Sequence, residues 1–225
     1  MLASGSEDGS ILLWSLIDNM ELHRFGQNHQ GTVESLVFSQ DNKLLVSGSE
    51  DGSIGLWSIS EGIKLFSLRE SSAVYAAELS DNGESFGFLG NDFIGSLDLV
   101  DHKYSATEID FPGNVMTANF SKNGELLAVG FEDGSIGVWS LKDFRRLFYF
   151  QGLYGAVQSL VFSRDYSMLV SAYRGDMIRF FNLRNGSREH VFISGNDRNW
   201  ASCNGAGFCK RSHVRGILQR VEQTG

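Results

Sequence analysis

Residues 46–58 read VSGSEDGSIGLWS, and the chain repeats this pattern. Close copies stand at residues 3–15, which read ASGSEDGSILLWS, and at residues 128–140, which read AVGFEDGSIGVWS. A more divergent copy, VSAYRGDMIRFFN, occupies residues 170–182. Self-similarity at a fixed period indicates a repeat architecture in which each repeat forms one supersecondary unit.

The copies keep a regular spacing. Trp57 stands 43 positions after Trp14, Trp139 stands 82 positions after Trp57, and Phe181 stands 42 positions after Trp139. The period is therefore 41 to 43 residues, with a degenerate repeat near Leu97. A second motif precedes the later copies: GTVESLVFSQDNKLLV at 31–46, GNVMTANFSKNGELLA at 113–128, GAVQSLVFSRDYSMLV at 155–170 and, in a weaker version, SAVYAAELSDNGESFG at 72–87.

Each period predicts four short strands joined by tight turns. The Asp51-Gly52 pair marks one such turn, because glycine admits the positive φ of a tight hairpin. Both faces of the resulting sheet carry apolar residues, so neighbouring sheets must pack face to face. Four-stranded antiparallel units of roughly 40–45 residues arranged radially form a β-propeller. In the clearest period, β-branched and aromatic residues predict strands at 32–39, 44–49, 54–58 and 64–68.

Over residues 3–193 the chain resembles the WD-repeat proteins, a family of β-propellers. The Trp-Asp dipeptide that names the family is Trp-Ser in this chain. Members of the family bury a hydrogen-bond network made of a His, a strand Ser, the turn Asp and the Trp. An indole or carboxylate buried without such partners would cost about 1–3 kcal/mol. The resemblance places the network at His29, Ser47, Asp51 and Trp57.

The other repeats keep only parts of this structural network. The first copy has Ser4, Asp8 and Trp14 without an upstream His. The copy at the middle of the chain has Asp133 and Trp139. We expect the degenerate repeats to depend on apolar packing instead and to open more easily.

The repeat predicts an all-β chain with four full blades and one partial N-terminal blade. Propellers have about 4 to 8 blades, and nothing after Phe192 resembles a strand that would complete the opening blade. We therefore expect an open or incomplete ring, completed by further sequence or by a partner, with a strained five-bladed ring as the alternative. The predicted propeller covers residues 1–193, with blades at 1–25 (partial), 28–69, 70–109, 110–150 and 151–193.

The remaining residues, 194–225, lose the repeat and predict a flexible or weakly helical tail. Cys203, Cys209 and His213 in this tail have the residue types of zinc ligands, but a structural zinc site normally needs four ligands and a closer cysteine pair. We predict no metal and no cofactor. The trio His29, Ser47 and Asp51 superficially offers catalytic chemistry, but it fits the buried network, so we predict that the chain is not an enzyme.

The composition narrows the class of protein further. The net charge is −8 and the isoelectric point is near 5.1, which argues against a non-specific nucleic-acid binder. Two cysteines are too few for a disulfide framework and favour a reducing compartment. The sequence shows neither an apolar run long enough to cross a bilayer nor the pattern of a signal peptide. These features predict a cytoplasmic protein, with the nucleus as the alternative, and no membrane partner.

Charge at the blade turns is the sharpest functional feature. Glu7, Glu50 and Glu132 each precede the turn Asp at equivalent positions, and Arg174 occupies that position in the last copy. In the family's layout these turns share one rim with the connections between blades. We expect a partner-binding rim that attracts a basic peptide segment; the alternative is that surface Glu residues only add solubility.

The leading functional interpretation is a non-catalytic scaffold or recognition module that binds protein partners and is part of a larger chain or complex. One alternative is a propeller enzyme with an unrecognised site. Another is an RNA-associated scaffold that uses the basic residues of the tail: Lys210, Arg211, Arg215 and Arg220.

Overall fold

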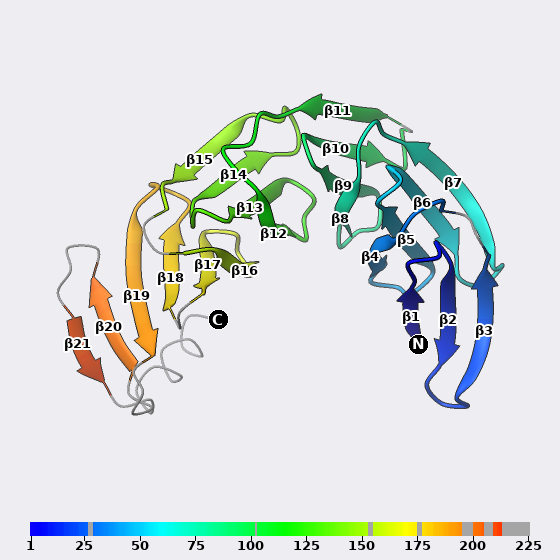
Figure 1. Ribbon diagram of the computed structural model, residues 1–225, viewed down its shortest axis with the longest axis horizontal. Coiled ribbons are helices and arrows are strands. Elements are labelled where there is room, and N and C mark those ends of the chain that lie inside the picture. Colours follow the sequence, from blue (N-terminus) through cyan, green and yellow to red (C-terminus); the bar gives the residue numbers. More distant parts are fainter. Residues whose placement is uncertain are drawn as a thin grey trace. The chain divides into compact units, whose positions relative to one another are not determined.

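The computed structural model describes residues 1–26, 29–101, 103–152, 155–174, 177–194, 200–204 and 209–212. Every regular element within these ranges is a β-strand, and the strands pair in chain order (Figure 1). Within the same ranges there is no helix long and apolar enough to cross a membrane. The predicted all-β class is confirmed.

The chain divides into two compact units. The first contains residues 1–111, 120–127 and 140–145, and the second contains residues 112–119, 128–139 and those from 146 onward.

Three sheets lie in the first compact unit, and each is an antiparallel meander. We call them blades 1, 2 and 3. Blade 1 has three strands, which agrees with the predicted partial blade: β1 (Leu2–Gly5), β2 (Ile11–Ser15) and β3 (Met20–Phe25). Blade 2 has four strands: β4 (Val33–Phe38), β5 (Leu44–Ser49), β6 (Ser53–Ser58) and β7 (Ile63–Arg69). Blade 3 also has four: β8 (Val74–Leu79), β9 (Ser85–Gly90), β10 (Phe93–Asp98) and β11 (Tyr104–Glu108).

Two further sheets follow, which we call blades 4 and 5. Blade 4 is the sheet β12 (Val115–Phe120), β13 (Leu126–Phe131), β14 (Ile136–Ser140) and β15 (Arg146–Phe150). Blade 5 begins with β16 (Val157–Phe162), β17 (Met168–Tyr173), β18 (Met177–Asn182) and β19 (Arg188–Ser194). Its sheet continues with β20 (Trp200–Asn204) and β21 (Cys209–Ser212), which belong to the segment where the sequence predicts a flexible or weakly helical tail. An edge strand such as β19 offers unpaired backbone groups to any following segment.

The hairpin between β5 and β6 shows how the repeated turn chemistry produces a blade. The Gly52 backbone N–H donates to the Ser49 carbonyl at 3.1 Å, and Gly52 has a φ of 81°. A Cβ at Gly52 would lie 2.5 Å from the Glu70 carbonyl oxygen, so both the backbone conformation and the close approach require glycine. The turn sets the register in which Leu45 lies opposite Trp57.

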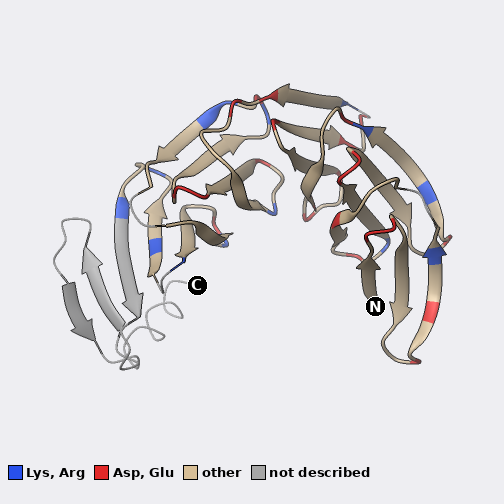
Figure 2. Cartoon of the chain, in the orientation of Figure 1, with Lys and Arg blue, Asp and Glu red and all other residues tan. Residues whose placement is uncertain are grey.

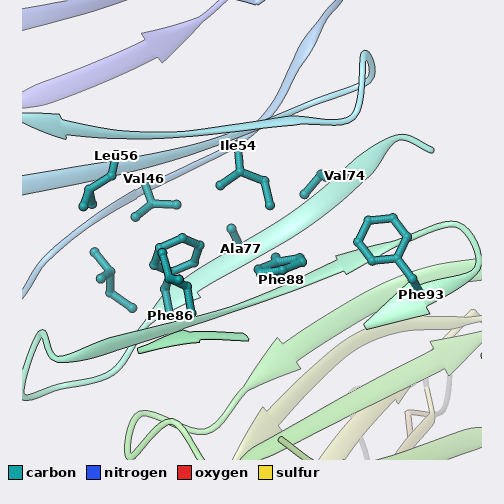
Figure 3. Packing of buried hydrophobic residues seen from close by; sticks show 10 residues of the cluster. Val46, Ile54, Leu56, Val74, Ala77, Phe86, Phe88 and Phe93 are labelled. Atoms are coloured by element: carbon teal, nitrogen blue, oxygen red, sulfur yellow. The ribbon is translucent and has the colours of Figure 1, made fainter. Parts of the chain in front are cut away.

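The core of the first compact unit lies between blades that pack face to face. All six residues of β6 are buried, so this strand is covered on both faces. Val46, Ile54 and Leu56 of blade 2 contact Phe86 and Phe88 of blade 3 in one cluster (Figure 3). On the other face of blade 2, the Phe25 and Trp57 rings lie 4.9 Å apart, which joins blade 2 to blade 1.

Candidate functional site: the blade turns and the buried network

Blade 2 contains a continuous hydrogen-bond network in its interior. The Trp57 Nε1–H donates to Ser47 Oγ at 2.9 Å, and Ser47 Oγ lies 2.7 Å from His29 Nε2. The His29 Nδ1 atom lies 2.5 Å from Ser53 Oγ, and the Ser53 hydroxyl donates to the Asp51 carboxylate. His29, Ser47 and Trp57 are each at most 2% exposed. The four residues that the resemblance selected therefore lie in one network.

Ser53 is the residue that the sequence reasoning missed. The direct distance from His29 Nδ1 to Asp51 Oδ1 is 4.0 Å, so the Ser53 hydroxyl is the bridge between imidazole and carboxylate. A signal was present, because a Ser follows the turn Gly in all three close copies of the repeat. In the copy of blade 4 the equivalent Ser135 hydroxyl donates to Asp133 at 2.6 Å.

The network holds His29 in its neutral form. Burial lowers the pKa of His29, and the nearby Asp51 only partly opposes this effect. One tautomer satisfies all atoms: Nε2 accepts from the Ser47 hydroxyl, while Nδ1–H donates to Ser53. Because Ser47 is buried and fully partnered, this trio has the geometry of an architectural network rather than of a reactive nucleophile.

Asp51 is anchored from several directions. Its Oδ1 accepts from the Ser53 backbone N–H at 2.8 Å, and its Oδ2 accepts from the Gln30 backbone N–H at 2.7 Å and from Arg69 at 3.0 Å. Although burial acts to raise the pKa of Asp51, the hydrogen bonds from Ser53 and Gln30 hold it well below its usual range. The carboxylate is thus ionised and fixes the turn to the chain segment that enters blade 2.

The turn aspartates of the other close copies lie in more open positions. Asp8 and Asp133 are exposed, and each accepts a hydrogen bond from the backbone N–H two residues further on. In blade 1 the Trp14 Nε1–H donates to Ser4 Oγ at 3.2 Å, and both side chains are only partly buried. In blade 4 the Trp139 ring meets Phe131 edge-on. The full four-residue network is therefore found in blade 2 among the described residues.

Blade 3 replaces the polar network by aromatic packing. Leu97 lies opposite Phe86 in the register in which Trp57 lies opposite Leu45, so Leu97 occupies the Trp position. Phe88 takes the place of the strand Ser and is fully buried. This apolar substitution fits the expectation for degenerate repeats.

The acidic rim residues lie at equivalent turns, several of which are coloured red in Figure 2. Glu50 lies between β5 and β6, Glu132 lies between β13 and β14, and Glu7 lies between β1 and β2 of the partial blade 1. Glu7, Glu50 and Glu132 are exposed. The Glu50 carboxylate accepts from the Thr32 hydroxyl at 3.0 Å, and the Glu132 carboxylate accepts from Asn114 Nδ2 at 2.8 Å. These equivalent contacts fix the two carboxylates while leaving them open to solvent.

Two other turns complete the comparison. In blade 3 the equivalent turn carries Asp92, whose carboxylate accepts a hydrogen bond from the Ser72 hydroxyl at 2.6 Å. This turn is shorter than the others, so Asp92 does not align with the turn acids when the repeats are compared by sequence. In blade 5, Arg174 is exposed, and its backbone N–H donates to the Ala156 carbonyl at 3.0 Å. The position equivalent to Glu50 is thus basic in blade 5.

No group of three or more His, Cys, Asp or Glu side chains could hold a metal ion within the described ranges. The candidates Cys203, Cys209 and His213 fall where side chains lie outside the described part of the structure.

Comparisons with known proteins agree with this architecture. The family model "WD domain, G-beta repeat" matches residues 20–58 and 105–140. Apoptotic protease-activating factor 1 of Rattus norvegicus is 28% identical over 203 residues, which cover 86% of this chain and 16% of that protein. The chain therefore spans about one sixth of the length of this relative. The β-propeller domain of Cps50 (Swd1) from Myceliophteria thermophila matches with a TM-score of 0.68 at 17% identity, covering 93% of this chain and 81% of that one.

The repeated antiparallel blades and the structural neighbour define the fold as a β-propeller. The repeat-model matches and the sequence relative support the similarity of the chain to the WD-repeat propellers. Propellers of this family generally mediate protein interactions, often within larger complexes, and are typically not enzymes.

Proposed function

We propose that the chain is a non-catalytic recognition module, part of a larger protein or complex, that binds basic segments of protein partners through its acidic blade turns. The observation that carries the proposal is the equivalent anchoring of Glu50 and Glu132. Each carboxylate is exposed and is held by a hydrogen bond to the residue just before the first strand of its own blade. A carboxylate fixed in this way loses little side-chain entropy when a Lys or Arg binds.

The neighbouring turns support the same function in the first compact unit. Glu7 and Asp92 add exposed carboxylates at the corresponding turns of blades 1 and 3. Carboxylates on one set of turns attract a cationic segment and speed its encounter with the protein. Such contacts are weakened by salt, because exposed charges are screened over about 8 Å at physiological ionic strength.

The test compares two double variants with equal charge change. Glu50→Lys with Glu132→Lys removes the anchored carboxylates, while Glu61→Lys with Glu125→Lys alters exposed positions away from these turns. Binding of a fluorescein-labelled peptide of alternating Gly and Lys or Arg is measured by anisotropy. We expect the first double variant to bind the peptide at least about tenfold more weakly than the second, which corresponds to about 1.4 kcal/mol of binding free energy. Equal affinities for the two variants would contradict the proposal, because net charge alone would then explain binding.

A further inference from the structure

A groove opens at the edge of the core between blades 2 and 3. It has a volume of about 400 Å³, and its lining is mostly apolar. Leu56 and Leu97 form its floor and also belong to the packed core between the two blades. The core is therefore open at this end. The other apolar lining residues are Leu44, Leu65, Phe66, Leu99 and Val100.

The walls of the groove expose large apolar side chains. Leu65 is 50% exposed and Val100 is 64% exposed. Leu65 lies on β7, where alternate side chains point outward and a polar residue would be expected. Adjacent exposed apolar side chains around a hollow are typical of an interaction site rather than of ordinary surface.

An acidic hollow continues the groove. It has a volume of about 170 Å³, shares Leu44 and Gly83 with the apolar groove, and contains Asp41 and Asp81. Glu84 lies at the junction, since it lines the apolar groove next to Gly83. None of the residues lining either hollow is basic.

These carboxylates are largely available to a partner. Asp41 pairs with Lys43 at 3.2 Å, but Lys43 is highly exposed, and exposed pairs of this kind contribute little. Within the described part of the chain, Asp81 and Glu84 form no ion pair.

The turn that presents the acidic residues is internally braced. The Ser80 hydroxyl donates to Asn82 Oδ1 at 2.6 Å, and Asn82 Nδ2 donates to the Glu84 carboxylate at 2.6 Å. The Leu99 backbone N–H donates to the Glu84 carbonyl at 2.7 Å, which ties the apolar wall to this turn. Apolar and acidic parts of the groove therefore hold a fixed relation to each other, which lowers the ordering cost of binding.

We propose that this groove binds a short segment of a protein partner in which large apolar side chains are flanked by Lys or Arg. The apolar side chains would fill the hollow over Leu56 and Leu97, and the basic flank would meet Asp81 and Glu84. The segment needs both kinds of residue. The apolar lining of the groove selects a large apolar side chain, and the carboxylates of Asp81 and Glu84, which form no ion pair in the described part of the chain, select basic residues beside it. The volume lies within the range of about 300–1,000 Å³ found for ligand pockets.

This surface is separate from the acidic turns of the proposed function. Asp41 and Asp81 follow the first strands of blades 2 and 3, whereas Glu50 follows the second strand of blade 2. Because successive turns of a meander lie at opposite ends of its strands, the groove and Glu50 lie at opposite ends of blade 2. The inference therefore stands independently of the proposed function.

Three fluorescein-labelled decapeptides test the inference by anisotropy with the full chain. The first carries adjacent Leu and Phe flanked on each side by Lys and Arg, with Gly and Ser as the remaining residues. The second replaces Leu and Phe by Ser, and the third replaces each Lys and Arg by Glu. We expect the first peptide to bind at least about tenfold more tightly than either control peptide.

Variants of the groove assign the binding to this surface. Leu65→Ser and Val100→Ser, tested separately because both positions are exposed, should each reduce the preference for the first peptide over the second. Asp81→Lys with Glu84→Lys should reduce the preference for the first peptide over the third. The matched control variants are Ile17→Ser, which is 92% exposed, and Asp18→Lys, which is also exposed; both lie in the turn between β2 and β3 of blade 1 and should leave these preferences unchanged.

Each other result overturns the inference. Unchanged preferences in all groove variants would place the peptide elsewhere, and loss of binding only in the double variant Glu50→Lys with Glu132→Lys would assign it to the acidic turns. Concentration-dependent sedimentation that Leu65→Ser and Val100→Ser remove, without peptide binding by the unaltered chain, would show that a second copy of the chain fills the groove. Near-ultraviolet circular dichroism identical to that of the unaltered chain confirms that the variants are folded.

Discussion

Replacing Ser47 by Ala tests whether the buried network stabilises blade 2. Ser47 Oγ is the shared partner of Trp57 Nε1 and His29 Nε2, at 2.9 Å and 2.7 Å, and the site is closed to water. The Ser47→Ala substitution removes one oxygen and leaves both groups without this partner. At about 1–3 kcal/mol for each unsatisfied buried group, the expected loss is about 2–6 kcal/mol.

The chain supplies matched controls at equivalent strand positions. Within the described residues Ser4 in blade 1 accepts from Trp14 alone and is partly exposed, so Ser4→Ala should cost about 0.5–1.5 kcal/mol. Ser171 in blade 5 is buried, and its hydroxyl has no hydrogen-bond partner in the described part of the chain. Ser171→Ala should therefore be neutral or stabilising, since it removes a buried polar group that gains nothing.

Hydrogen exchange measured by mass spectrometry resolves the effect blade by blade. This choice matters because a chain with two compact units need not unfold in one transition. A loss of about 2 kcal/mol should speed exchange of the protected amides of β5 and β6 by about 30-fold. If Ser47→Ala exchanged no faster there than Ser171→Ala, the network would not contribute to stability and the reasoning would be refuted.

Two further predictions concern the same blades. Burial lowers the pKa of His29 in the folded chain, so the unfolded chain takes up a proton first as the pH falls. The free energy of unfolding should therefore decrease as the pH is lowered through about 6.5. Urea unfolding at a series of pH values measures this dependence, and His29→Asn should flatten it. Gly52→Ala should lower the melting temperature more than Gly83→Ala. Both residues have positive φ, at 81° and 68°, but only a Cβ at Gly52 meets a backbone carbonyl, while the space at Gly83 is open. Equal melting temperatures for the two variants would show that the contact with Glu70 is not limiting.

The blades were predictable because their signals are local. Each tight turn needs a glycine at positive φ and an aspartate that accepts a hydrogen bond from a residue two positions later. Both requirements fall within four or five residues, so each occurrence of EDGS locates a hairpin. The expected strands at 32–39, 44–49, 54–58 and 64–68 correspond to β4 through β7 with small shifts at the ends. The position of the degenerate blade 3 was also predictable, because Leu97 occupies the strand position that Trp57 occupies in blade 2.

Other properties depend on which surfaces meet after folding. The resemblance treated Asp8, Asp51 and Asp133 alike, yet among the described residues only Asp51 receives a basic side chain and an incoming backbone N–H that enclose it. The repeated turn motif places Ser53 beside Asp51, but the contact of Ser53 with His29 joins residues 24 positions apart and is not encoded in that motif. The groove likewise combines Leu65 of blade 2 with Val100 of blade 3, which are brought together only when the two sheets pack. Periodic turns and strands follow from short-range backbone chemistry, whereas burial, bridging contacts and binding surfaces arise from packing between segments distant in the chain.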